Sequence, residues 1–155
     1  KARHGREDFT ITTQEDMLRT LSNILDVLTM AVGALGSISL LVGGIGIMNI
    51  MLVSVAERTR EIGLRKAIGA SNLHIISQFM IESLIISIVG GITGYVFGYI
   101  VAFAISTFLT FDPVFTWEIA GIAFGMSVLV GVAFGLYPAI RAARKDPIES
   151  LRQYY

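Results

Sequence analysis

Charged side chains gather in one short stretch of the sequence, and their types predict binding rather than catalysis. Residues 57–71 read ERTREIGLRKAIGAS. Glu61 and Arg65 stand four residues apart, in the order that favours an ion pair along a helix. Gly69 is typical of a helix end, and Ser71 is typical of the start of the next helix. We predict a short charged helix here, although the composition is equally typical of a solvated positive-inside loop.

Other residue types exclude several kinds of site. The chain has no Cys, which excludes disulfides, thiolate metal ligands and a cysteine nucleophile. His4 and His74 are isolated, so we expect no metal site. Lys and Arg together number 12, as do Asp and Glu, and this balance does not indicate nucleic-acid binding. Neither a G-x-x-x-x-G-K-[ST] phosphate loop nor a G-x-S-x-G elbow occurs, so we predict no catalytic residue and no cofactor in this chain.

Two polar residues, Asn49 and Glu82, stand within or beside long apolar regions. An acid inside a membrane is a functional hypothesis by default. Glu82 nevertheless follows Ser71 by only roughly 16 Å of helix, so a structural role, at the membrane interface or in a pair with a nearby arginine, is the alternative. For Asn49 we expect a hydrogen bond between helices.

These residues must be positioned by helices that cross a membrane. Hydrophobic residues make up 54% of the 155 residues and charged residues only 15%, well below the roughly 25% of soluble domains. Asp, Glu, Lys and Arg are absent from residues 27–56, 83–111 and 119–140. A helix needs about 20 apolar residues to cross a bilayer. The sequence therefore predicts three transmembrane helices.

The basic residues predict the orientation of these helices. Four basic residues lie between the first and second spans, namely Arg58, Arg60, Arg65 and Lys66. Four more follow the third span, namely Arg141, Arg144, Lys145 and Arg152. The loop at 111–117 has no Lys or Arg. The positive-inside rule then predicts a cytoplasmic C-terminus and an external N-terminus. Basic residues also precede the first span, but most are too far from it to count for much.

The residues before the first span differ from a membrane segment. Residues 8–13 alternate and are β-branched, which is typical of a strand, and Glu15 and Asp16 then mark the first turn of a helix. A lone strand does not fold by itself, and the first residue is Lys1 rather than Met. We therefore expect a piece of a longer protein that starts at the end of an extracytoplasmic domain.

Glycines four residues apart predict close packing between helices, because small residues let helix backbones approach in lipid. The candidates are Gly43, Gly44, Gly46, Gly90, Gly94, Gly98, Gly121, Gly125, Gly131 and Gly135. They suit static packing within one subunit or a sliding seam between helices or subunits.

Long motifs follow one another along the chain. LVGGIGIMNIMLVSV occupies residues 41–55 and is followed by AERTREIGLRKAIGAS, by QFMIES at 78–83, by Gly90-Gly91, and by YPA and DPIESLR near the end. Together they resemble the MacB/FtsX-like permease family of ATP-binding cassette (ABC) transporters, over essentially the whole chain. The sequence departs from the family at Ala56, where Thr is common, which affects at most a local hydroxyl cap.

With this resemblance, the predicted fold is all-α and integral to the membrane. It has three transmembrane helices, a short cytoplasmic coupling helix and the end of an extracytoplasmic domain at the N-terminus. The segments are 1–22 (domain end and stalk start), 23–55 (stalk and transmembrane helix), 56–70 (coupling helix), 71–110 (transmembrane helix), 111–117 (external loop), 118–140 (transmembrane helix) and 141–155 (cytoplasmic tail). Family members have four transmembrane helices, so the chain resembles their C-terminal part.

The resemblance also implies partners. An ABC ATPase that binds ATP and Mg²⁺, in another chain or a fused domain, would dock on the coupling helix at Glu57, Arg58, Thr59, Arg60, Glu61, Ile62, Arg65 and Lys66. A second permease copy, a membrane-fusion adaptor and the lipid bilayer of a bacterial or archaeal plasma membrane are the other implied partners. Asp146, Pro147 and Glu149 predict a second small helix, which either touches the ATPase or leaves the neighbouring basic residues to anchor at the membrane surface.

The predicted function is mechanical transmission of ATP-driven motion to an extracytoplasmic domain, for efflux of drugs, peptides or lipoproteins. An alternative is an FtsX-type signalling subunit that uses the same motion to activate an external cell-wall hydrolase. An unrelated three-span channel or scaffold is a third class. The GGIGIMNIMLVSV run favours the first, because it is associated with MacB-like members.

Overall fold

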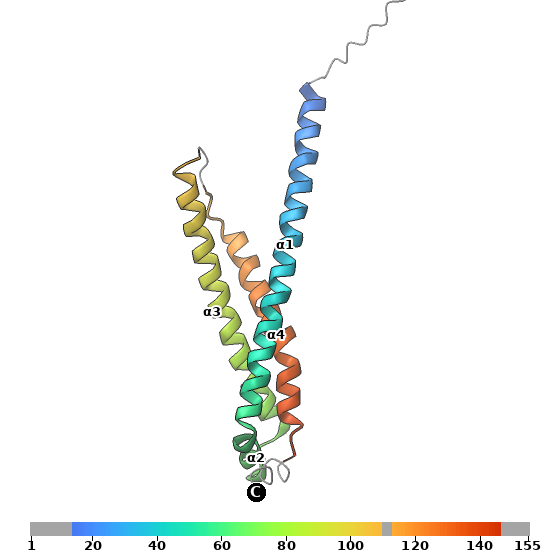
Figure 1. Cartoon of the computed structure of the whole chain (residues 1–155), viewed down its shortest axis with the longest axis vertical. Coiled ribbons are helices and arrows are strands. Elements are labelled where there is room, and N and C mark those ends of the chain that lie inside the picture. Colours follow the sequence, from blue (N-terminus) through green and yellow to red (C-terminus); the bar gives the residue numbers. More distant parts are fainter. Residues whose placement is uncertain (1–13, 110–112, 147–155) are drawn as a thin grey trace, which may run out of the picture. The chain divides into compact units, whose positions relative to one another are not determined.

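The computed structural model describes residues 14–109 and 113–146, and every regular element in these ranges is an α-helix. Helix α1 is Gln14–Glu57, α2 is Thr59–Ala67, α3 is Asn72–Ser106 and α4 is Trp117–Ala143 (Figure 1). Helices α1, α3 and α4 are long and apolar enough to cross a membrane. The predicted all-α fold with three helices that could span a membrane is confirmed for the described residues. The strand predicted at residues 8–13 lies outside the described residues, as does the predicted second helix beyond Asp146.

The chain divides into two compact units, residues 1–39 and residues 40–155. The described part of the first unit is the beginning of α1, where every residue is exposed. Its hydroxyl groups at Thr20, Thr29, Ser37 and Ser39 each donate to the carbonyl four residues earlier. A helix in lipid must satisfy its polar groups internally, and this back-bonding does so for Thr29, Ser37 and Ser39, which lie in the charge-free run.

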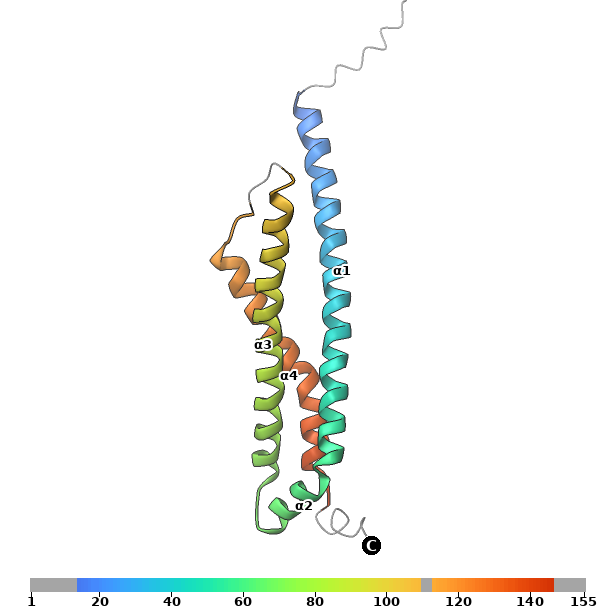
Figure 2. The same cartoon turned by 60° about the vertical axis from the view of Figure 1, so that its left-hand side comes forward.

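The second unit is built on the antiparallel pair α3 and α4, which lie side by side in both views (Figure 1, Figure 2). Serine faces glycine at successive steps of four residues along this seam: Ser83 with Gly135, Ser87 with Gly131, and Ser127 with Gly91. A Cβ added to any of these glycines would come within 3.0 Å of its serine, closer than real Cβ atoms approach. The glycines therefore allow the close approach of the two backbones.

The seam also contains a hydrogen bond between the helices. The Ser83 hydroxyl is fully buried and lies 2.9 Å from the carbonyl of Met80 and 3.1 Å from that of Gly131. A buried hydroxyl without a partner would be costly, and these two carbonyls supply acceptors on both helices. The pairing of serine with glycine thus fixes the register of α3 against α4.

The predicted glycine candidates separate into two groups. Gly44, Gly131 and Gly135 lie against a side chain of another helix, which for Gly44 is the ring of Phe134. An added Cβ would meet nothing within 4 Å at the rest, which are Gly43, Gly46, Gly90, Gly94, Gly98, Gly121 and Gly125. Only the first group packs within the described chain.

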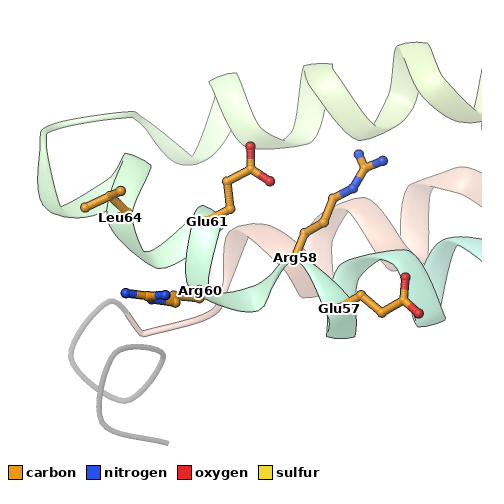
Figure 3. Close-up of a pocket in the computed structure, with 5 residues that line it drawn as sticks. All are labelled: Glu57, Arg58, Arg60, Glu61 and Leu64. Atoms are coloured by element: carbon orange, nitrogen blue, oxygen red, sulfur yellow. The ribbon is translucent and has the colours of Figure 1, made fainter. Parts of the chain in front are cut away.

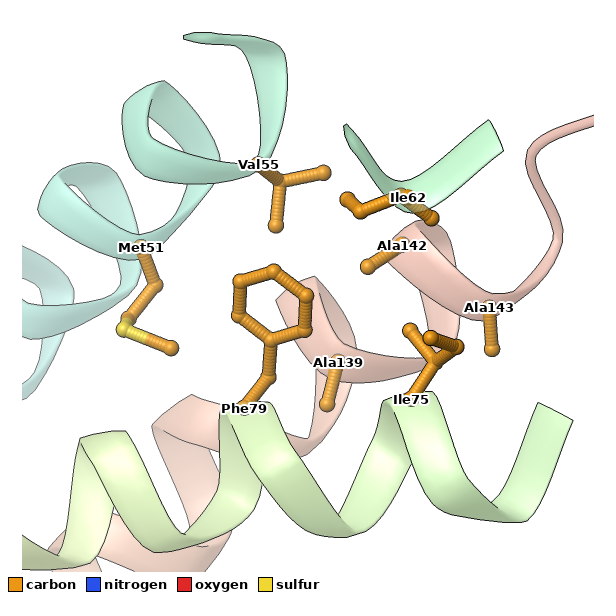
Figure 4. Packing of buried hydrophobic residues seen from close by; sticks show 8 residues of the cluster. All are labelled: Met51, Val55, Ile62, Ile75, Phe79, Ala139, Ala142 and Ala143. Atoms are coloured by element: carbon orange, nitrogen blue, oxygen red, sulfur yellow. The ribbon is translucent and has the colours of Figure 1, made fainter. Parts of the chain in front are cut away.

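The core sits where α1, α2, α3 and α4 come together (Figure 4). Phe79 of α3 is 1% exposed and points towards Met51 and Val55 of α1 (Figure 4). The other members are Ile62, Ile75, Ala139, Ala142 and Ala143. The three alanines come from the last turns of α4, where small side chains leave room for α2 and α3.

The turn between α2 and α3 has the predicted chemistry. Gly69 has a φ of +103°, and its N–H donates to the Lys66 carbonyl at 3.0 Å. The N–H of Ala70 donates to the Arg65 carbonyl at 3.0 Å, which completes a Schellman motif. The Ser71 hydroxyl then accepts from the His74 N–H and caps α3. These bonds fix the position at which α2 ends and α3 begins.

Replacing Gly69 with alanine is expected to lower the free energy of unfolding by about 1 to 2 kcal/mol, because an L residue is strained at this φ. The measurement is thermal unfolding of the purified protein in detergent. Gly94→Ala makes the same chemical change inside a helix where an added Cβ has open space. An equal loss of stability in both variants would contradict the prediction.

Candidate functional site at the short charged helix

Helix α2 has an inner and an outer face. Ile62 is 1% exposed and lies in the core with Phe79 and Ala142 (Figure 4). Arg60 and Leu64, on the other side of the helix, are exposed. Residues three and four apart share a face of a helix, so the predicted charged helix presents one set of side chains to the bundle and another set outward.

Lys66 fastens α2 to the end of α4. Its ammonium group donates to the carbonyl of Ala143 at 2.7 Å and to that of Lys145 at 2.8 Å. The last carbonyls of a helix have no partner within the helix and carry partial negative charge. The Lys66 side chain is therefore the cap of α4, supplied by a residue far away in the sequence.

Arg65 fastens α2 to α3. Its Nη1 donates to Oε1 of Gln78 at 2.6 Å, and its Nη2 pairs with Oε1 of Glu61. The predicted pair along the helix is thus present, and the same guanidinium also reaches the neighbouring helix. A planar guanidinium has donors that point in fixed directions, so the two contacts together hold Arg65 in one orientation.

Arg58 makes the third link, to Glu82 of α3. Its Nη1 lies 3.4 Å from Oε2 of Glu82, and the two side chains are 46% and 32% exposed. Ion pairs in contact with solvent contribute only about 0 to 1 kcal/mol, so this pair orients α2 more than it stabilises the fold. The pair of Glu82 with a nearby arginine, one of the structural alternatives, is present, and a functional role of Glu82 stays a prediction.

The outer face of α2 borders a hollow of about 500 Å³, lined by Glu57, Arg58, Arg60, Glu61 and Leu64 (Figure 3). Arg60 has no ion pair among the residues that the structure describes. Leu64 is 56% exposed and was not among the predicted contacts. Its place four residues after Arg60 is the sequence signal for a shared outer face.

The eight residues predicted to contact an ATPase therefore occupy different environments. Glu57, Arg60 and Glu61 line the outer hollow, and Arg58 lines it while also pairing with Glu82. Ile62, Arg65 and Lys66 are directed to the core, to α3 and to α4. Thr59 donates to the Val55 carbonyl at 2.9 Å, across the junction of α1 and α2. Asn49 is exposed on α1.

This arrangement suits binding coupled to movement. The outer face offers both signs of charge and an apolar side chain to a partner, while the inner face is attached to α1, α3 and α4. Within the described residues, no group of three His, Asp or Glu side chains could hold a metal ion. A force applied to the outer face of α2 would reach the long helices through the core and the three basic side chains.

The sequence is similar to known permeases. The family of FtsX-like permease C-terminal domains matches residues 33–147. The uncharacterized ABC transporter permease YknZ of Bacillus subtilis is 44% identical over 152 residues, which cover 96% of this chain and 38% of that protein. The macrolide export ATP-binding/permease protein MacB of Azoarcus sp. is 47% identical over 151 residues, covering 97% and 23%. MacB of Vibrio parahaemolyticus is 43% identical over 152 residues, also covering 97% and 23%. The chain thus spans less than two fifths of the length of these relatives.

Proposed function

The chain belongs to the FtsX-like permease family, and from this premise we propose that it transmits ATP-driven motion within an ABC transporter. In this proposal α2 is the coupling helix that docks on an ABC ATPase, and the ATPase binds ATP and Mg²⁺ and hydrolyses the nucleotide. The chain itself performs no hydrolysis. The long helices carry the movement of α2 to an extracytoplasmic domain.

One observation carries the proposal: α2 is bound to the bundle on one face and open on the other. Lys66 reaches α4, Arg65 reaches α3, and Ile62 lies in the core. Arg60 and Leu64 remain exposed beside the hollow. A loop that served only to set topology would not need side chains that attach it to several helices.

The continuous helix α1 provides a route for the movement. Its 44 residues exceed the about 20 that cross a bilayer. Met51 and Val55 near its end pack on the same core as Ile62, so displacement of α2 would shift this end of α1. We propose that α1 carries the shift outward as one helix, and that the close seam between α3 and α4 moves with it as a body.

The positive-inside rule supports a cytoplasmic location for α2 and for the end of α4, and an external N-terminus. The setting is then a multi-pass protein of the bacterial inner membrane. A second copy of the permease and a membrane-fusion adaptor complete the proposed assembly. The MacB relatives are named for macrolide export, so we propose to test efflux of drugs before efflux of peptides or lipoproteins.

Replacing Arg60 with glutamate is expected to weaken ATPase association by roughly tenfold or more, because like charges brought together at an interface cost several kcal/mol. The measurement is co-purification of the full-length protein with its ATPase from membranes, with ATP hydrolysis of the reconstituted complex recorded on the same samples. Arg60 makes no described ion pair within the chain, so the fold should be unaffected.

Arg19→Glu provides the matched control, because Arg19 is also exposed and the change of charge is the same. Its association and hydrolysis should equal those of the wild type. If Arg60→Glu also left association, hydrolysis and transport unchanged, the outer face of α2 would not be the docking site, and the proposed function of this helix would be wrong.

A further inference from the structure

A second hollow lies on the last turns of α4, apart from the outer face of α2. Tyr137, Ile140, Arg141 and Arg144 line it, and its volume is about 460 Å³. These residues are spaced at three, four and seven positions, so they form one stripe of the helix. Tyr137, Arg141 and Arg144 are exposed, and Ile140 is half-buried. The hollow thus has an apolar floor and two guanidinium groups.

Neither guanidinium has a carboxylate partner within the described residues. This differs from Arg58 and Arg65, which both pair with an acid on their own or a neighbouring helix. Arginine presents donors in a planar fork that matches the oxygens of a phosphate group. The two arginines on one stripe are therefore suited to an external anion.

The end of a helix usually repels an anion, because its carbonyls carry partial negative charge. Here the ammonium group of Lys66 lies on the carbonyls of Ala143 and Lys145. This contact offsets the negative end of α4 and adds a positive charge close to Arg144. The carbonyl end of α4 is thus covered by a cation, and the nearest acid in the described chain, Asp146, follows Arg144 by two residues.

The position along α4 indicates where the anion comes from. The charge-free run of residues 119–140 ends directly before Arg141, and α4 is long and apolar enough to cross a membrane. Arg141 and Arg144 would then lie at the level of the lipid headgroups, with Tyr137 in the interfacial zone that suits its amphipathic ring. Basic pockets at this depth are suited to anionic headgroups.

We propose that Tyr137, Ile140, Arg141 and Arg144 form a binding site for the headgroup of an anionic phospholipid. The two guanidiniums bind the phosphate, and Tyr137 and Ile140 pack against the start of the acyl chains. The inference rests on insertion of α4 in the membrane and not on ATPase docking. A bound lipid at this place would hold the end of α4 that Lys66 joins to α2.

The test uses the purified full-length protein in vesicles of phosphatidylcholine with and without phosphatidylglycerol, with retained lipids counted by native mass spectrometry after gentle extraction. We expect one phosphatidylglycerol to be retained in preference to phosphatidylcholine. In the double variant Arg141→Gln/Arg144→Gln, the affinity for phosphatidylglycerol should fall roughly tenfold or more. Arg141→Lys/Arg144→Lys keeps the charge but loses the planar fork, and should give an intermediate loss.

Three results of the lipid measurements would overturn the site. One is unchanged lipid retention in the glutamine variant. The second is full retention in the lysine variant, since general attraction to a charged surface would then suffice. The third is displacement of the lipid by inorganic phosphate alone, which would indicate a site for a free anion.

Thermal unfolding in neutral detergent checks that the glutamine variant is folded, and Arg19→Gln controls for loss of a positive charge elsewhere. ATPase association is measured in parallel: its loss without loss of lipid would assign the two arginines to a protein contact.

Discussion

Alanine at Gly135 is expected to force α3 and α4 apart and to lower the free energy of unfolding by about 1 to 3 kcal/mol, the usual cost of overpacking. A Cβ at this position would overlap both the hydroxyl and the Cβ of Ser83. Ser83 is fully buried and its hydroxyl also bonds to Gly131, so it has little freedom to move aside. Thermal unfolding of the protein in detergent measures the loss.

Two further variants make this prediction specific to the seam. Gly125→Ala changes another glycine of α4, one with open space around it in the described structure, and should leave the unfolding temperature nearly unchanged. Ser83→Gly should restore part of the stability of Gly135→Ala, whereas Ser83→Ala should not, because its remaining Cβ would still overlap. Additive effects of Gly135→Ala and Ser83→Gly would show that the two residues are not in contact.

Local features of the fold could be predicted because they depend on neighbouring residues. Runs without charge are visible directly in the sequence, and they gave the three long helices. The caps at Gly69 and Ser71 depend on backbone conformations that these residue types favour. The pair of Glu61 with Arg65 needs only the spacing of one helical turn. No knowledge of the tertiary packing was needed for any of these.

The sequence could not show which glycines pack against another helix, because the spacing of Gly90, Gly94 and Gly98 equals that of Gly131 and Gly135. Only the facing helix separates them. The serines supply the missing signal. Ser83 and Ser87 lie on α3 and Ser127 lies on α4, each spaced by four residues from the next member of its series. In an antiparallel pair of helices, each of these serines faces a glycine. Serine is small enough to let helices approach as glycine does, so a serine series opposite a glycine series indicates the faces that meet.

The sequence also does not determine which face of α2 each basic side chain occupies. Ile62 and Lys66 are four residues apart in α2, so a buried Ile62 brings Lys66 to the inner face. Arg58, directly before α2, lines the outer hollow and also pairs with Glu82. A charge that serves the interior has the same appearance in sequence as one that serves a partner. The difference arises from what lies opposite, which here is Glu82 and the last carbonyls of α4.

Methionine at Lys66 is therefore expected to separate binding from transmission. The outer face of α2 remains intact, so association with the ATPase should stay within about twofold of the wild type. The carbonyls of Ala143 and Lys145 lose their shared donor, and α4 is no longer held to α2 by a charged group. Transmission of the movement of α2 to α4 should then weaken, because only the apolar core contact of Ile62 with the alanines of α4 still joins the two helices.

Glu118→Cys, at an exposed position in the first turn of α4, adds a thiol to a chain that contains no Cys. It lies at the end of the span rather than inside it, so its rate of thiol labelling can report on this movement. In the otherwise wild-type protein the labelling rate should differ by about fivefold between nucleotide-bound and nucleotide-free complexes, a typical size for coupling between sites. Lys66→Met should reduce this difference, and Lys66→Arg should retain more of it because a cation still faces the helix end. If the difference in labelling rate were as large in Lys66→Met as in the wild type, the Lys66 link to α4 would not carry the movement. If the ATPase dissociated instead, Lys66 would belong to the docking face and the division of α2 into two faces would be wrong.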